Sequence, residues 1–312
     1  TFRELFELGK KLGEGAYSVV HVCTHIKTGK MFAVKVLERS AMAKEDKEAL
    51  LVEVSTLRQI RHPNIVRLVA FFDNDPKNFF LVTELCKGGD VFDRVVERER
   101  YTESEARATL YCLLDAIATL HRVGIVHRDV KPENILLSSP DPDAPIKLAD
   151  FGFAAAGNKH DESLGTPAYL APELVHGHAY GAGVDVWAAG VTAFVLLSGF
   201  FPFPSVPGDE EHHHLFERIR TTDPEYGPEW RAVSAEARGF VQWLLTKDPK
   251  KRPTASEALK HPWFAASLAA DRPLEAAKKS LSKYHAKRRI NLLKGAVWTS
   301  VLTKKIGGGG EG

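Results

Sequence analysis

The sequence has little cysteine, and it lacks long apolar runs. Its 312 residues include three cysteines, Cys23, Cys86 and Cys112, and none of them forms a CxxC pair or shows zinc-ligand spacing. This odd number of widely separated thiols indicates reduced side chains rather than a disulfide framework. The longest apolar stretch, around residues 187–197, is too short to cross a bilayer. We therefore expect a cytoplasmic protein without a transmembrane segment.

The chain also lacks a large net charge, because 42 Lys and Arg nearly offset 40 Asp and Glu, leaving +2. The distribution is uneven. Residues 278–312 carry nine basic side chains and one acidic one, whereas the other 277 residues carry 33 basic and 39 acidic. An apolar content of 44% with 26% charged residues is typical of a globular protein. An acidic body with a basic tail indicates that the tail has a partner of its own, which could be the body itself.

The two halves of the chain follow different patterns, which predict an α+β fold. Short β-branched or aromatic runs predict strands over residues 6–12, 19–24, 32–37, 65–72 and 79–84, with one helix over 41–60. Later periodicity predicts helices over residues 91–98, 103–122, 184–198, 212–220, 234–246 and 255–259. Thr102 followed by Glu105 is a capping box at the start of the second of these helices. A β-rich front thus precedes a helix-rich back.

Two features of the front half are compatible with phosphate binding. Gly13 and Gly15 lie between two expected strands, where glycines allow a backbone turn to approach a polyphosphate. Glycine-containing hairpins without a ligand are common, so this signal alone is weak. Lys35 lies in an apolar strand and needs a partner if it is buried, for which Glu53 on the expected helix is suitable. The alternative is a lysine at a strand end in solvent.

Stronger signals lie in the segment 127–134, which reads HRDVKPEN and precedes an apolar run. Twenty-one positions after Asp129 comes Asp150, followed by Phe and Gly. Asp129 can orient and deprotonate a hydroxyl, and Lys131 can neutralise a moving phosphoryl group. Asn134 and Asp150 offer the oxygen ligands that Mg²⁺ prefers. These groups together supply what phosphoryl transfer requires.

Together with Ala171-Pro172-Glu173, these motifs resemble the eukaryotic protein kinase family over residues 6–264, in order and in spacing. The resemblance implies a bilobal fold, with an N-lobe over 6–85 and a helical C-lobe over 86–264. It implies ATP and Mg²⁺ as cofactors, and phosphotransfer by Asp129, Lys131, Asn134 and Asp150, of which Asn134 and Asp150 hold the metal. The nucleotide site that it implies consists of Leu12, Gly13, Glu14, Gly15, Val20, Ala33, Lys35, Glu53, Thr83, Glu84, Cys86 and Leu136.

Further residues resemble the serine/threonine branch of that family, namely Lys131 and the segment 165–169. Asp90 and Glu133 match positions where basophilic kinases hold carboxylates for an arginine upstream of the target hydroxyl. The resemblance therefore implies Arg-x-x-Ser/Thr substrates. The alternative is that these two acids are solvated surface residues.

The activation segment of such kinases often carries a phosphate that neutralises the arginine preceding the catalytic aspartate, here Arg128. Glu162 stands four residues before Thr166, where relatives that use such a switch have a phosphothreonine. A carboxylate at that position could satisfy Arg128 without phosphorylation. In the alternative interpretation Glu162 is solvated and Ser163 is the phosphosite.

The basic tail resembles the regulatory segment of calcium/calmodulin-dependent protein kinases, closest to the type II subgroup. On a helix, Leu293, Val297 and Leu302 share a face, Trp298 lies beside them, and basic residues flank both ends. The resemblance implies that residues 265–306 are autoinhibitory and bind calcium-loaded calmodulin supplied in trans, through Arg288, Arg289, Leu293, Val297, Trp298 and Leu302. Residues 307–312 are a glycine-rich linker or tail.

Three interpretations compete at this point. The first is a kinase under calmodulin control that phosphorylates proteins with basic residues upstream of Ser or Thr. The second is a kinase-fold scaffold, and the third is a kinase whose tail binds anionic lipid instead of calmodulin. All the phosphotransfer residues are present, which favours an active enzyme. We expect no nucleic-acid partner.

Overall fold

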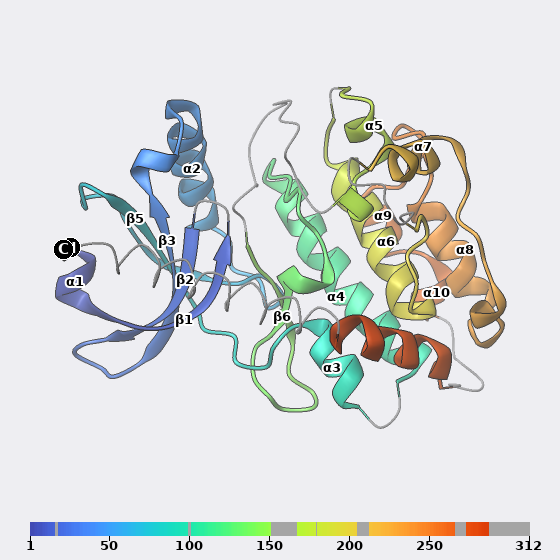
Figure 1. The fold of residues 1–312 in the computed structure, drawn as a ribbon, viewed down its shortest axis with the longest axis horizontal. Helices are drawn as coiled ribbons and strands as arrows, with labels where there is room; N and C mark the ends of the chain where they lie inside the picture. Colours follow the sequence, from blue (N-terminus) through green and yellow to red (C-terminus); the bar gives the residue numbers. More distant parts are fainter. Residues whose placement is uncertain are drawn as a thin grey trace, which may run out of the picture.

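The computed structural model describes residues 1–15, 18–98, 101–150, 167–178, 180–204, 212–265 and 273–286. The side chains of residues 14, 15, 45, 46, 49, 52, 53 and 56 are not part of the description. The chain folds into a small lobe built on a β-sheet and a larger helical lobe (Figure 1). The bilobal α+β architecture expected from the sequence is therefore confirmed.

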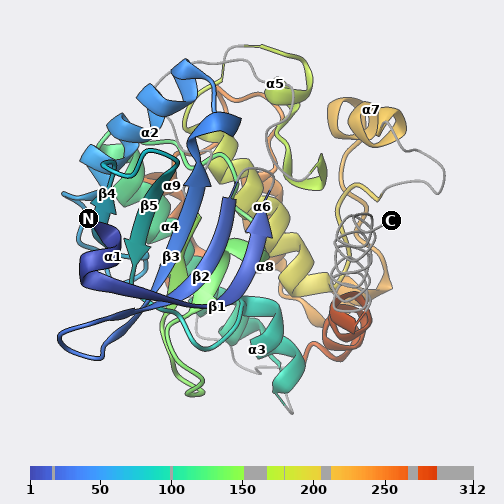
Figure 2. The same ribbon diagram turned by 60° about the vertical axis from the view of Figure 1, so that its left-hand side comes forward.

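The small lobe contains one antiparallel sheet of five strands in the order β1-β2-β3-β5-β4. The strands are β1 (Phe6–Gly15), β2 (Ser18–His25), β3 (Met31–Glu38), β4 (Leu68–Phe72) and β5 (Asn78–Thr83). They are preceded by α1 (Phe2–Leu5) and interrupted by α2 (Lys44–Leu57). Figure 2 shows the sheet face-on with α2 beside it. All five predicted strands are present, but β4 starts at Leu68, because Ile65 instead pairs with Leu148 of the other lobe.

Alternation along β3 separates a structural face from a functional one, because successive side chains of a strand point to opposite sides. Phe32 and Val34 belong to an apolar cluster on the outer face of the sheet, where Phe2 stacks on Phe80 with ring centroids 4.3 Å apart. Lys35 occupies an alternate position on the same strand and points away from this cluster. The packing of the outer face thus fixes which side of β3 presents the lysine.

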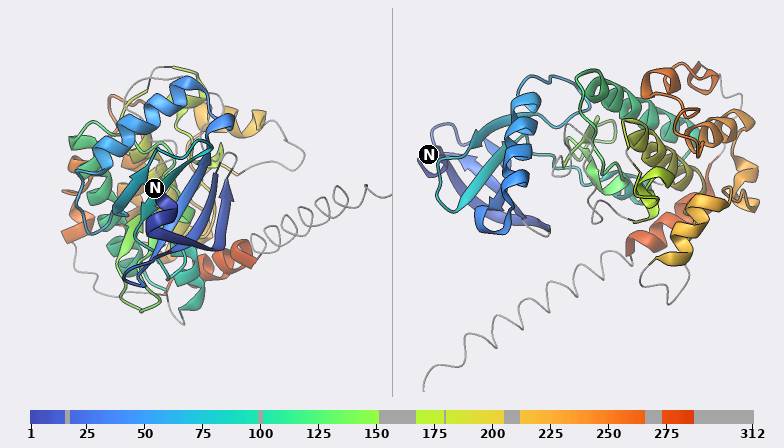
Figure 3. Two further views of the ribbon diagram at one scale, coloured as in Figure 1. Left: turned by 90° about the vertical axis from the view of Figure 1, so that its left-hand side faces the viewer. Right: turned by 90° about the horizontal axis from the view of Figure 1, so that it is seen from above.

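The large lobe is built around α4 (Glu103–Arg122) and α6 (Gly183–Ser198), which pack against each other. The remaining helices are α3 (Val91–Glu97), α5 (Pro172–Val175), α7 (His213–Thr221), α8 (Ala235–Leu244), α9 (Ala255–Ala258) and α10 (Pro262–Ala265). The predicted capping box of Thr102 and Glu105 is present at the start of α4. Figure 3 shows the sheet lobe in front of the helical lobe on the left, and the two lobes side by side on the right.

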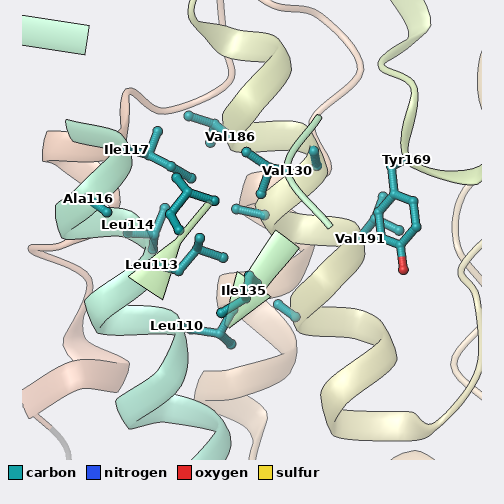
Figure 4. Close-up of a cluster of buried hydrophobic side chains, with 14 of the residues drawn as sticks. Leu110, Leu113, Leu114, Ala116, Ile117, Val130, Ile135, Tyr169, Val186 and Val191 are labelled. Atoms are coloured by element: carbon teal, nitrogen blue, oxygen red, sulfur yellow. The ribbon is translucent and has the colours of Figure 1, made fainter. Parts of the chain in front are cut away.

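A two-stranded hairpin of β6 (Ile135–Leu137) and β7 (Ile146–Leu148) lies between the lobes and was not predicted as such. Its strands are only three residues long, too short for a periodic pattern. Val130 and Ile135, which flank residues 131–134 of the HRDVKPEN segment, are fully buried among side chains of α4 and α6 (Figure 4). This cluster anchors the part of the segment that carries Lys131 and Asn134.

A further helix covers residues 275–286 and packs against α3 (Figure 1). Its start is fixed where Leu274 donates a backbone hydrogen bond to Tyr101, at 2.8 Å. Its apolar residues Ala277 and Leu281 are buried in the main core. Among the described residues, no helix combines the length and the apolar character needed to span a membrane.

One buried ion pair joins distant parts of the large lobe. Arg252 binds both carboxylate oxygens of Glu173, at 2.7 and 2.9 Å. The guanidinium also donates to the carbonyls of Gly183, Thr246 and Lys247. Because Arg252 has further acceptors on two segments, the pair ties α5 to the start of α6 and to the region after α8.

Replacing Glu173 by alanine should leave the Arg252 charge buried without its carboxylate. We expect a loss of about 3–5 kcal/mol in the free energy of unfolding, measured by urea titration. Lys251→Met is the matched control, because the exposed ion pair of Lys251 with Asp248 spans 3.9 Å and should contribute less than about 1 kcal/mol. A loss as small as that of the control would contradict a structural role for the Glu173–Arg252 pair.

Candidate active site

The segment 127–134 is held in place by a single buried carboxylate. Asp185, near the start of α6, accepts the backbone N–H groups of His127 and Arg128, each at 2.8 Å, and the Nε2–H of His121, also at 2.8 Å. Burial opposes ionisation of Asp185, but the hydrogen bonds from His121 and His127 hold its pKa below the ordinary value. Arg128 has a left-handed φ of 67°, so the tight turn at this point needs such an anchor.

His127 connects this segment to the residues preceding Asp150. Its Nε2 lies 3.1 Å from the carbonyl of Ala149, and the backbone N–H of Asp129 lies 3.3 Å from its Nδ1. A neutral imidazole with the proton on Nε2 satisfies both contacts. Burial lowers the pKa of His127, which agrees with the neutral form. The imidazole therefore acts as a neutral bridge between two functional segments.

Three of the predicted catalytic residues lie in direct contact. Lys131 Nζ is 2.9 and 2.8 Å from the two carboxylate oxygens of Asp129. Asn134 Nδ2 donates to the backbone carbonyl of Asp129 at 2.7 Å and to its Oδ2 at 2.8 Å. The Asp129 carboxylate is thus oriented from two sides by groups of its own segment.

Lys35 and Asp150 meet across the gap between the lobes, with Nζ and Oδ1 2.5 Å apart. Asp150 adopts a φ of 59°, in the left-handed region. The sequence suggested Glu53 as the partner of Lys35. Glu53 belongs to α2, but its side chain is outside the described part of the chain, so that pairing stays a prediction.

The connection between the lobes offers backbone groups suited to an adenine ring. The Glu84 N–H donates to Arg67, and the N–H groups of Lys87 and Gly88 donate to Ser138 and Leu137. Among the described residues, the carbonyl of Glu84 and the N–H of Cys86 make no backbone hydrogen bond. One acceptor and one donor two residues apart can pair with the edge of a purine. Burial raises the pKa of the Cys86 thiol to about 11, so it lines this region as a neutral group.

Apolar residues implied in the nucleotide site lie on neighbouring elements. In the sheet, Val20 is the register partner of Lys35, and Ala33 is the partner of Thr83. Leu136 lies on β6, beyond the connection between the lobes. Leu12 and Gly13 lie on β1, where Gly13 pairs with Val20 and Gly15 with Ser18. Residues 16 and 17 and the side chain of Glu14 lie outside the described part of the chain.

The two acids expected to bind substrate have different environments. Asp90 is 6% exposed and caps α3, accepting from the N–H groups of Phe92 and Asp93 at 2.9 and 3.1 Å. Glu133 is half-buried in the 3₁₀ turn Pro132–Asn134, which packs against α3. Asp90 therefore has a structural role that sequence reasoning missed, although an Asp two residues before Phe92 is a typical cap signal.

Other expected positions lie outside the described residues, which include neither 151–166 nor 287–312. They are Glu162, Thr166, Arg288, Arg289, Leu293, Val297, Trp298 and Leu302. Two partners of site residues were also missed from the sequence. Lys147 binds the Glu84 carboxylate at 2.8 Å, and His121 binds Asp185. Neither has a local signal, because each is brought in from a distant element.

Asp185→Asn should destabilise the protein by about 2–4 kcal/mol at pH 7, because a buried anion with three donors is replaced by a neutral amide. The pKa of Asp185 is lowered in the folded protein, so its ionised carboxylate stabilises the fold at pH values above the unfolded-state pKa of about 4. This stabilisation is lost as the pH falls below that pKa. Urea titrations at pH 7, 5 and 3.5 should therefore show the difference from wild type shrinking only at the lowest pH.

The exposed Asp73 provides the control, since Asp73→Asn should leave the stability nearly unchanged at every pH. A constant difference between Asp185→Asn and wild type down to pH 3.5 would contradict the assigned role of the charge.

Comparison with known proteins agrees with this geometry. Residues 6–264 match the family model for the protein kinase domain. The chain is 40% identical over 309 residues to calcium/calmodulin-dependent protein kinase type IV of Mus musculus and of Homo sapiens, covering 97% of this chain and 63% of each relative. It is 38% identical to the type II delta subunit of Oryctolagus cuniculus, covering 57% of that protein. On the match of the family model, the chain belongs to the protein kinase family.

Proposed function

We propose that the chain is an ATP-dependent serine/threonine protein kinase. The observation that carries this proposal is the contact of Asp129 with Lys131 and Asn134 in the large lobe, together with the Lys35–Asp150 contact, which joins the two lobes. Acidic, basic and amide groups of these kinds are what phosphoryl transfer requires. The similarity to calcium/calmodulin-dependent kinases supports the same reaction class.

In this proposal the Asp129 carboxylate accepts the proton of the substrate hydroxyl as its oxygen attacks the γ-phosphorus of ATP and ADP leaves. Lys131, held beside Asp129, offsets the charge on the moving phosphoryl group. The ammonium group of Lys35 forms an ion pair with Asp150. In this proposal it also binds phosphate oxygens of ATP. The backbone groups of Glu84 and Cys86 bind the adenine edge.

Asn134 and Asp150 fit the role of ligands for a divalent cation, for which we propose Mg²⁺. The amide nitrogen of Asn134 is turned towards Asp129, which leaves its Oδ1 on the opposite side. Among the described residues, no group donates a hydrogen bond to this oxygen. Amide and carboxylate oxygens are hard ligands that suit Mg²⁺, and a bound ion would neutralise the phosphates.

We further propose that substrates carry an arginine upstream of the target Ser or Thr, and that Glu133 is its main partner. Glu133 lies one residue before Asn134, next to the catalytic segment. Asp90 supports the same site less directly, because one of its oxygens already accepts two backbone N–H groups of α3. An arginine bound by a carboxylate forms strong charge-assisted hydrogen bonds.

Peptides with Arg three residues before Ser should be phosphorylated, and Glu133→Gln should raise the KM for them about tenfold without changing kcat. The measurement is steady-state transfer of ³²P from ATP to matched peptides carrying Arg or Ala at that position. The Ala peptide should respond little to Glu133→Gln.

Asp150→Asn is the control for catalysis and should reduce incorporation to background. Unchanged phosphate transfer by this variant would overturn the proposed function. If the wild-type enzyme phosphorylates the Arg peptide and the Ala peptide equally well, only the substrate assignment is overturned.

We also propose that the basic tail inhibits the kinase and that calcium-loaded calmodulin relieves the inhibition. The helix over residues 275–286 lies on α3, which follows the connection between the lobes. The sequence after this helix continues with basic residues that resemble a substrate with upstream cations. An acidic body favours binding of such a segment, and calmodulin would favour the released form.

Calcium-loaded calmodulin should increase the activity of the full chain, and Trp298→Ala should weaken its binding at least tenfold, because large aromatic side chains dominate such interfaces. Fluorescence titration with labelled calmodulin, repeated in EGTA, measures the affinity. Sedimentation with anionic liposomes tests the competing interpretation. If the chain binds anionic liposomes but does not bind calmodulin in a calcium-dependent way, anionic lipid replaces calmodulin as the proposed partner.

A further inference from the structure

An imidazole–carboxylate contact holds the helix over residues 275–286 against the kinase body. His285 Nε2 lies 2.6 Å from Asp93 Oδ1 of α3, a contact between residues 192 positions apart. His285 is 8% exposed and the Asp93 side chain is 30% exposed, so the contact is partly shielded from water. A carboxylate oxygen only accepts, and Nε2 must therefore carry a proton in either charge state of the imidazole. What changes on further protonation is the charge that faces Asp93.

Two further contacts of this docking surface are made by uncharged groups. The ring of Tyr284 packs edge-on against Phe92 and Phe201, with centroids 5.5 and 5.9 Å apart. Ser280 Oγ donates to the carbonyl of Gly199 at 2.7 Å. Gly199 is so close to the helix that an added Cβ would lie 2.7 Å from Ser280 Cβ. These contacts position the helix but do not respond to pH near neutrality.

The titratable groups near His285 come from two elements, α3 with its cap and the helix over residues 275–286 itself. On α3 and its cap, Asp90 accepts backbone N–H groups, Arg94 donates to the carbonyl of Ala144, and Glu97 is exposed, which leaves Asp93 as the acid in contact. The segment 199–204 contains no ionisable side chain. The helix itself contributes Glu275, Lys278, Lys279, Lys283 and Tyr284.

Asp93 is suited to hold a cation without rearranging. Its Oδ2 already accepts the backbone N–H of Asp90 at 2.8 Å, as part of the capping box of α3. Its Oδ1 is turned towards the helix over residues 275–286. One carboxylate thus fixes the start of α3 and receives His285 at the same time.

We propose that His285 and Asp93 form a proton-sensitive latch for the helix over residues 275–286. The charged imidazole of His285 holds this helix against α3 more tightly than the neutral imidazole does. Histidine is the side chain that ordinarily changes charge between pH 5 and 8. Protonation turns a neutral hydrogen bond into an ion pair in a partly dehydrated site. Docking is therefore strongest at the acidic end of that range and weakens as the pH rises. This inference rests on the proposed inhibitory role of the tail.

Hydrogen exchange of the full chain at pH 6.2 and 7.8 tests the latch without relying on catalysis. The measured exchange rates are compared with the intrinsic rates at each pH, which gives a protection factor for each amide. The protection factors of residues 277–286 should be about threefold to fivefold higher at pH 6.2 than at pH 7.8. In His285→Gln, a neutral amide replaces the imidazole near the same oxygen, and the difference between the two pH values should disappear. Asp93→Asn should have the same effect from the other side.

His25→Gln is the matched control, because His25 hydrogen-bonds Thr28 in the small lobe, far from the latch, and should keep the wild-type pH response. Unfolding midpoints of all variants show whether the fold is intact. An unchanged pH response in His285→Gln would overturn the latch. In contrast, removal of residues 273–312 without any rise in calcium-free activity would overturn the inhibitory role, while leaving the exchange result intact.

Discussion

The buried carboxylate of Asp185 is the constraint on which the active site depends. A charge with no exposed surface is costly unless every oxygen is hydrogen-bonded, and here three donors supply those bonds. Two of the donors are backbone N–H groups of the catalytic segment. The free energy that keeps Asp185 ionised is therefore also what holds Arg128 in its left-handed conformation, directly before Asp129.

The apolar core completes this arrangement from the opposite side. Val130 and Ile135 are buried at the two ends of the segment that carries Lys131 and Asn134. Polar residues between them are therefore held at the surface of a rigid core instead of on a mobile loop. His127 extends the same network through Ala149 to Asp150, which binds Lys35 of the sheet lobe. A continuous set of contacts thus runs from one lobe to the other.

The helix α3 follows the connection between the lobes and contacts the helix over residues 275–286. Its cap, Asp90, follows the two glycines after this connection, and its Asp93 receives His285 of the helix over residues 275–286. In the proposed regulation, a movement of that helix would therefore act first on α3.

The sequence by itself determined the kinase motifs, the two-lobe order and most element positions, because short-range periodicity and fixed spacing carry that information. The helix over 103–122 was predicted with its capping box, since Thr102 and Glu105 are local signals. Only the tertiary structure decided that His121 supports Asp185 and that His285 reaches Asp93. Those contacts join residues 64 and 192 positions apart, and they depend on chain packing, which leaves no periodic trace in the sequence.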